Sequence, residues 1–328
     1  MDGKITVSTL LLTLSLLMGC SAKGATSSAE DKQGQPDSIA DTASVAFNAD
    51  SAYLFIKSQC DFGARVPGTK AHSDCARWLS SKLAQYCDTM IVQRANLTTF
   101  DGVKVDIQNL IGIFNPKAER RLLLFAHWDS RPWADQDPDE SKHKEPVMGA
   151  NDGASGVGVL LEIARQLQLK RPDLGVDILL TDLEDWGSDS DDSSWAMGAR
   201  YWAQHPHIAD YHADMGILLD MVGDANARFY WEYFSANYAP SMLHSLWAEA
   251  KDAGYGEYFV AEQGGAITDD HVEIIKNANI PCIDIIDLNH GDGTVGFPPY
   301  WHTTHDTIDK ISRNTLRAVG SVVLKTLY

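Results

Sequence analysis

Carboxylate and imidazole side chains recur in five short segments, each beside an apolar run or a glycine-rich turn. The segments are His127-Trp128-Asp129, Asn151-Asp152-Gly153, Glu184-Asp185, Asp220, and the stretch from Trp301-His302 to Asp306-Thr307. Taken singly, each has an ordinary structural explanation, because Asp before Gly often caps a turn and acidic pairs often lie on a solvated edge. Together, oxygen and imidazole groups without sulfur favour a catalytic zinc with an open coordination position. Other divalent ions remain an alternative.

Several of these groups directly follow apolar runs that have the length of a strand. We expect strands at 105–114, 121–127, 176–181, 215–221 and 282–288. Stripes of apolar residues at spacings of three and four predict helices at 71–84, 155–169, 241–253 and 314–327. This alternation predicts an α/β fold, a three-layer sandwich with a central mixed, largely parallel sheet flanked by helices. Ligands in such folds bind at the carboxyl ends of the strands, where His127, Glu184 and Asp220 are expected.

Composition limits the classes of function. The 328 residues carry 45 acidic and 27 basic side chains, a net charge of -18, which argues against a nucleic acid partner. The hydrophobic and charged fractions, 44% and 22%, are typical of a globular protein that can bury a core without structural staples. No internal repeat or second linker interrupts the chain. We therefore expect one catalytic domain at 42–328.

The N-terminus has the pattern of an export signal. Lys4 precedes an apolar run at 10–17, which is too short to span a membrane, and Leu17-Met18-Gly19-Cys20 resembles a bacterial lipoprotein box. We expect a signal peptide at 1–20 and a flexible polar tether at 21–41. A lipid on Cys20 would be the only membrane attachment, in the periplasm or outer membrane of a Gram-negative bacterium. An ordinary secretory signal with a chance cysteine is the alternative.

The remaining four cysteines, Cys60, Cys75, Cys87 and Cys282, show no CxxC spacing, which argues against a thiolate metal site. An export compartment permits disulfides. Buried free thiols or one disulfide are favoured over a reactive thiol.

The order of the motifs resembles that of the zinc-dependent aminopeptidase superfamily. The motifs are HxD at His127 and Asp129, NDGASG around Asp152, the acidic pair, LLD ending at Asp220, and HTTxDT starting at His302, and they span roughly 108–310. In that superfamily an HxD histidine, a bridging Asp, one acid of the pair, the LLD Asp and the HTT histidine hold two zinc ions. The first Glu of the pair is the general base.

Within that superfamily the sequence looks more like the glutaminyl cyclases, which convert an N-terminal glutamine of peptides or proteins to pyroglutamate and release ammonia. The similar segments are Trp128 within HxD, 131–135, 267–271 and Trp301-His302. One departure stands out, because the aminopeptidases usually show Glu-Glu where this chain has Glu184-Asp185. The shorter Asp185 also departs from the animal cyclases and leaves open whether a second metal ion binds.

The cyclase resemblance implies a role for each site residue. Asp152, Asp185 and His302 would hold a single zinc, with His302 preferred over His305 by the HTTxDT register. Glu184 would be the general base and acid, beside a hydrogen-bonded pair of Asp220 and Asp269 near the departing amide. Trp195, Ile267 and Trp301 would line the substrate pocket.

Two alternatives remain beside the cyclase. A two-zinc aminopeptidase would use His127 as a metal ligand, whereas under the cyclase interpretation His127 and Asp129 only support the site. A non-catalytic binding module predicts a broken ligand set, and the set is intact. One geometric question is open, because neighbouring residues of an extended chain face opposite ways, so Glu184 and Asp185 reach one site only through a local bend.

Overall fold

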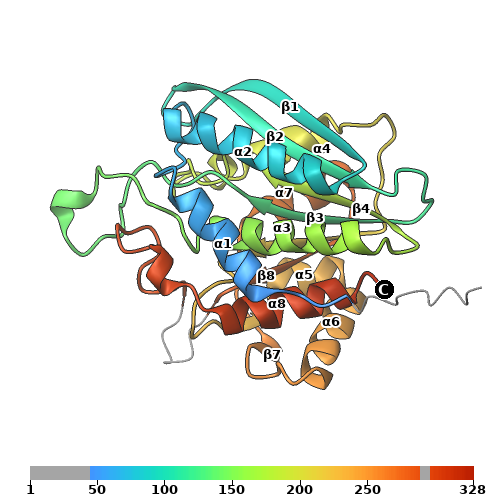
Figure 1. Cartoon of the computed structure of the whole chain (residues 1–328). Helices are drawn as coiled ribbons and strands as arrows, with labels where there is room; N and C mark the ends of the chain where they lie inside the picture. The colour runs from blue at the N-terminus through green and yellow to red at the C-terminus, as the bar shows by residue number, and fades with distance from the viewer. Residues whose placement is uncertain (1–44, 289–295) are drawn as a thin grey trace, which may run out of the picture. The chain divides into compact units, whose positions relative to one another are not determined.

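A mixed six-stranded sheet forms the centre of this computed structural model, which describes residues 45–288 and 296–328 (Figure 1). The strand order is β1-β2-β4-β3-β5-β8. The strands are β1 Thr89–Thr98, β2 Lys104–Phe114, β3 Arg121–His127, β4 Gly175–Thr181, β5 Met215–Asp220 and β8 Cys282–Ile286. β4, β3, β5 and β8 run parallel, while β1 and β2 are antiparallel at one edge. The predicted mixed, largely parallel sheet is confirmed.

Helices cover both faces of the sheet. α2 (Lys70–Tyr86) and α3 (Ala154–Leu169) pack on one face, and α1 (Ala49–Cys60) and α8 (Arg313–Lys325) pack beside α3 (Figure 1). α4 (Met197–Gln204) and α7 (Asp270–Ala278) contact each other and the opposite face. The remaining elements are η1 Glu140–Lys142, η2 Asp192–Ser194, β6 Phe229–Trp231, α5 Tyr233–Tyr238, α6 Pro240–Asp252, β7 Phe259–Gln263 and η3 Ile308–Lys310. The three-layer sandwich is therefore as predicted.

Alternating side chains of the central strands fill two separate cores. Leu122 and Leu124 of β3 belong to the core under α3, whereas Leu123 and Phe125 pack with α4 and α7. This follows from the two-residue period of a strand, and because both faces are covered the run is apolar throughout. β1 was missed because an edge strand buries little and carries a mixed pattern. The short β6, β7, α4, α5 and α7 were also missed.

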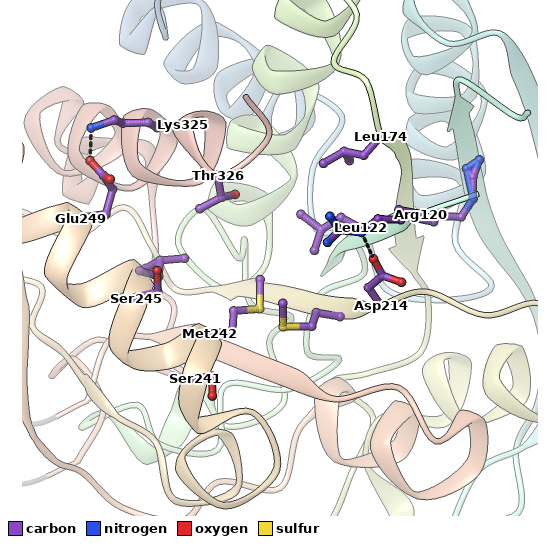
Figure 2. Close-up of a pocket in the computed structure, with 13 residues that line it drawn as sticks. Arg120, Leu122, Leu174, Asp214, Ser241, Met242, Ser245, Glu249, Lys325 and Thr326 are labelled. Atoms are coloured by element: carbon purple, nitrogen blue, oxygen red, sulfur yellow. Dashed lines mark hydrogen bonds and ion pairs between the residues drawn. The ribbon is translucent and has the colours of Figure 1, made fainter. Parts of the chain in front are cut away.

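The two ends of the parallel strands differ in character. At the amino ends, a hollow of about 400 Å³ lies between β3, β5, α6 and the end of α8, with Leu122, Leu174 and Met242 in its wall (Figure 2). Ion pairs Arg120–Asp214 and Lys325–Glu249 lie at this hollow (Figure 2). Most of the polar groups singled out in the sequence lie at the opposite, carboxyl ends.

The described chain begins near this hollow. Val45 and Phe47 lie against Leu324 and Lys325 of α8, and Lys325 also lines the hollow. The ring of Phe47 packs so closely on Gly320 that a Cβ there would lie 2.2 Å from it. The predicted signal peptide and tether lie outside the described residues. Within the described part, no helix is long and apolar enough to cross a membrane.

All four cysteines of the described chain are free thiols. Of the two alternatives left open by the sequence, the structure has the free thiols and not the disulfide. Burial raises the pKa of Cys60 to about 11 and that of Cys75 to about 12, so these two thiols stay protonated near neutral pH.

Candidate active site

A cleft of about 260 Å³ opens at the carboxyl ends of the parallel strands and brings together every residue predicted for the site. Its lining includes Asp152, Glu184, Asp185, Trp195, Asp220, Ile267, Asp269, Trp301 and His302. These positions come from six different segments, so only the fold makes them neighbours. His305, the competitor of His302, is exposed and does not line the cleft.

Three side chains converge as the ligand set of one metal ion. Asp152, Asp185 and His302 each offer a ligand atom within 4.8 Å of the others. Nε2 of His302 lies 3.1 Å from Oδ1 of Asp185 and 3.5 Å from Oδ2 of Asp152. Neither oxygen of the buried Asp185 accepts a hydrogen bond. A buried carboxylate without a donor is costly unless a cation pairs with it, so two oxygens and one nitrogen fit a zinc ion here.

A second set shares Asp152. Nε2 of His127 lies 3.0 Å from Oδ1 of Asp152 and 3.3 Å from Oδ1 of Asp220, and these three groups also lie within 4.8 Å of one another. His127 thus contacts two residues that line the cleft, Asp152 and Asp220, although it is not itself part of the lining. The side chains present fit one ion at the first set and have the types for a second.

A local bend turns both members of the acidic pair toward the cleft. Leu183 adopts a φ of 56°, which interrupts the alternation of the extended chain after β4. The carboxylate of the fully buried Asp129 accepts hydrogen bonds from the backbone N–H groups of Glu184 (3.1 Å) and Asp185 (3.2 Å). This answers the geometric question left by the sequence, because both side chains reach one site.

Asp152 is held by a residue to which the sequence assigned no role. The buried Asp306 carboxylate accepts from the backbone N–H groups of Asn151 (2.8 Å) and Asp152 (3.1 Å). Burial raises the pKa of Asp306 to about 7, and the charge of Asp152 adds to the shift. The signal was present, since Asp306 is the acidic residue of the HTTxDT motif.

Burial dominates the electrostatics of the remaining carboxyls. It raises the pKa of Glu184 well above its usual range, against the influence of His127 and with added repulsion from Asp269 and Asp185. It raises the pKa of Asp220 to about 8, where the charges of Asp152 and Asp269 add to the effect. Such groups hold protons at pH values where exposed carboxyls are ionised.

The expected hydrogen bond between Asp220 and Asp269 is not found among the described residues. Oδ1 of Asp220 lies toward His127, while Oδ1 of Asp269 accepts from the backbone N–H of Asp270. The reason is that Asp269 is the N-cap of α7, which turns one of its oxygens onto the helix terminus. Its other oxygen, Oδ2, is buried without a hydrogen-bond partner, and the two carboxyls still influence each other electrostatically.

Aromatic rings form the walls of the cleft. Trp301 stacks on His302 with ring centroids 3.5 Å apart, and Phe297 packs on Trp301 at 4.6 Å. Trp195 lies nearly parallel to the His302 ring at 6.0 Å. Phe297 was missed because nothing in its glycine- and proline-rich surroundings marks it. Trp186 does not line the cleft.

Comparisons with known proteins agree with this architecture. A model of peptidase family M28 matches residues 109–327. A glutaminyl cyclase of Porphyromonas gingivalis is 47% identical, with a TM-score of 0.84 over 87% of this chain and 99% of that one. A Zn-dependent exopeptidase of Parabacteroides distasonis is 48% identical, with the same TM-score and the same coverage, 87% and 99%. The glutaminyl-peptide cyclotransferase of Drosophila melanogaster is 28% identical, covering 79% of this chain and 75% of its own. The chain therefore belongs to peptidase family M28, and its relatives place it with the glutaminyl cyclases of that family.

Proposed function

We propose that this enzyme cyclises the N-terminal glutamine of peptides or proteins to pyroglutamate with one zinc ion bound by Asp152, Asp185 and His302. The observation that carries the proposal is the juxtaposition of this ligand set with Glu184 in a small, aromatic-walled cleft. A flat, neutral carboxamide side chain suits such a cleft, since small-ligand pockets are largely apolar with a few placed polar groups. The carboxylates around it favour the cationic N-terminus of a peptide.

The reaction forms one C–N bond and breaks another. When bound, zinc supplies a Lewis acid that polarises the γ-carbonyl of the glutamine. Glu184 accepts a proton as the α-amine attacks the γ-carbon and donates it to the amide nitrogen, which leaves as ammonia. Ring closure gains from proximity, because nucleophile and carbonyl belong to the same residue.

The other cleft residues orient the reacting groups. Asp220 and Asp269, which line the same cleft as Glu184, hydrogen-bond the departing amide nitrogen. Trp195, Ile267 and Trp301 enclose the glutamine side chain and exclude water, which disfavours hydrolysis to glutamate. Each role follows from the position of the residue around the cleft.

Export and anchoring belong to the same proposal. The lipoprotein-type signal at 1–20 and the tether at 21–41 support a lipid anchor on Cys20 in the periplasm or outer membrane. The substrates would then be exported peptides or proteins with an N-terminal glutamine.

The second candidate is a two-zinc aminopeptidase. Its support is specific, because His127, Asp152 and Asp220 form a second ligand set that shares Asp152 with the first. It requires a metal-activated water as nucleophile, whereas the cyclase needs none. The identity of the product separates the two activities.

Mass spectrometry of two peptides tests the proposal. The zinc-loaded protein is incubated with a peptide that begins with Gln and with the same peptide beginning with Leu. Loss of one ammonia from the Gln peptide alone is expected. Stepwise removal of N-terminal residues from either peptide would establish the aminopeptidase instead.

A pair of variants assigns the general base. Glu184→Gln is expected to lower kcat by about 100- to 10,000-fold, because general acid–base catalysis contributes on that order, while zinc stays bound. Glu119→Gln is the control, since Glu119 is exposed near the amino end of β3 and should behave as the wild type. Equal kcat values for the two variants would remove Glu184 from this role.

A further inference from the structure

Arg131 is a buried cation that contacts residues of the cleft without lining the cleft itself. Its side chain is 2% exposed. Nη1 donates to the backbone oxygen of Asp185 at 3.1 Å and lies 3.5 Å from Oδ1 of the same residue. Nε and Nη2 form a fork on the carboxylate of Asp135, at 2.7 and 2.6 Å. The guanidinium therefore connects one ligand of the proposed zinc site with an acid outside the ligand set.

That acid belongs to a segment that holds the second ligand, His302. Oδ1 of Asp135 lies 3.7 Å from Nδ1 of His302, the ring nitrogen that faces away from the ligand set. The next residue, Gln136, donates its backbone N–H to the backbone oxygen of His302 at 3.1 Å. Asp137 accepts from the backbone N–H and hydroxyl of Thr304, at 2.9 and 2.6 Å. Asp135 and Gln136 thus contact the ring and the backbone of His302, and Asp137 holds Thr304, two residues further along the chain.

The backbone of His302 gives a reason for such support. Its φ of 53° lies in the left-handed region, which a histidine rarely adopts without external restraint. The contacts from 135–137 supply that restraint from a different part of the chain.

Arg131 also contacts a wall of the cleft. Its guanidinium carbon lies 4.9 Å from the ring centroid of Trp195 and 5.2 Å from that of Trp133. A cation over an aromatic face is attracted to it, more strongly when both are desolvated. Arg131 thus touches Trp195 directly and His302 through Asp135.

We propose that Arg131 is a positioning residue that aligns Asp185, His302 and Trp195 together, with Asp135 as its intermediary to His302. The proposal rests on the proposed function, which makes Asp185 and His302 zinc ligands and Trp195 a substrate wall. The fork on both oxygens of Asp135 requires a guanidinium, and a lysine ammonium does not provide it. Loss of a partner behind a metal ligand costs about 10- to 100-fold in metal affinity or activity.

Three variants and one control separate positioning from general stability. Arg131→Met removes all the contacts, Arg131→Lys keeps only the charge, and Asp135→Asn removes the charge facing His302 and one oxygen of the fork on Arg131. The control is Arg121→Met, because Arg121 is also buried and paired with an acid, Asp177 at 3.2 Å, but lies at the amino end of β3. The readouts are the zinc dissociation constant by chelator competition, tryptophan emission, and kcat and KM for a Gln peptide.

We expect Arg131→Met to lose about 10- to 100-fold in zinc affinity, to raise KM and to shift the emission of Trp195. Arg131→Lys should recover little of this loss. Asp135→Asn should lose zinc affinity with a smaller rise in KM than Arg131→Met, since Asp135 reaches Trp195 only through Arg131. Arg121→Met should lose stability but keep the zinc affinity and both kinetic constants.

Zinc affinity and KM of Arg131→Met equal to those of Arg121→Met would overturn the proposal, as would full rescue by Arg131→Lys. If Arg131→Met does not fold, Asp135→Asn decides, and wild-type zinc affinity in that variant counts against the proposal. The zinc measurement needs no turnover. A wild-type protein that binds zinc but releases no ammonia would therefore overturn the proposed function and leave the test of Arg131 intact.

Discussion

Glycine at position 153 leaves room for the ring of His127. A Cβ on Gly153 would lie 2.3 Å from Nε2 of His127, a distance that real side chains do not tolerate. Asp152 precedes this glycine and contacts the same ring. The absence of a side chain at Gly153 therefore allows Asp152 to approach His127. Close approach of backbone to a functional group is one of the uses of glycine.

Gly153→Ala is therefore expected to displace His127 or Asp152 and to lower both zinc affinity and kcat, each by about 10-fold or more. Gly256→Ala is the matched control, since its nearest neighbour would be 3.6 Å from the new Cβ. Chelator competition and steady-state kinetics measure both. Wild-type values for Gly153→Ala would show that His127 does not need its present position.

At the scale of elements, the turn after β4 depends on one carboxylate. Asp129 follows β3 and receives two backbone N–H groups from the neighbouring turn, so it ties the ends of two parallel strands together. An asparagine at this position has only one oxygen and would leave one buried N–H group without an acceptor. An unsatisfied buried donor costs about 1–3 kcal/mol.

We predict that Asp129→Asn lowers the free energy of unfolding by about that amount, 1–3 kcal/mol, and reduces kcat because Glu184 loses its fixed direction. Urea denaturation and peptide kinetics give the two quantities. Unchanged kcat in a destabilised variant would mean that the turn keeps its shape without Asp129.

Asp177 of β4 is a buried acid in the middle of the sheet, and its pKa makes the stability of the protein depend on pH. Asp177 lies 3.2 Å from Nε of Arg121 and accepts from the hydroxyl of Tyr211 at 2.7 Å. Burial nevertheless outweighs these partners and raises its pKa to about 6. The folded protein therefore binds this proton more tightly than the unfolded chain, where the pKa of Asp is about 3.9.

The sign of the pH effect follows. As the pH falls through about 6 toward about 4, Asp177 takes up its proton in the folded state first, and its contribution to the free energy of unfolding rises by about 3 kcal/mol. Asp177→Asn should lack this component. The difference between wild type and variant in urea denaturation, measured across that range, isolates it from the other buried carboxyls. A difference that does not change with pH would contradict the raised pKa.

At the scale of the whole molecule, the described chain starts far from the cleft. Phe47 packs on Gly320 of α8, and Val45 and Phe47 line a pocket with Lys325, which also lines the hollow at the amino ends of the strands, whereas the cleft lies at their carboxyl ends. The described chain therefore begins on the side of the sheet away from the substrate cleft.

We expect a protein that starts at Val45 to have the same kcat/KM as one that starts at Ser21, within about twofold, because Val45 lies on the side of the amino ends of the strands and the cleft lies at their carboxyl ends. Kinetics on a Gln peptide compare the two. A marked loss of activity in the shorter protein would assign residues 21–44 a part in the cleft.

The fold class and the site residues of this protein could be predicted from the sequence, because both depend on local sequence patterns. Apolar runs end in carboxylates and an imidazole, and their order marked the family, the main strands and every residue named for the site. Local patterns do not contain contacts between distant segments. Only the tertiary structure decided that Leu183 bends to turn Glu184 and Asp185 to the same side, and that Asp220 lies toward His127. The contacts of Asp306 and Arg131 could not be predicted for the same reason, although Asp306 itself stands in the HTTxDT motif, since buried hydrogen bonds join residues that only packing brings together.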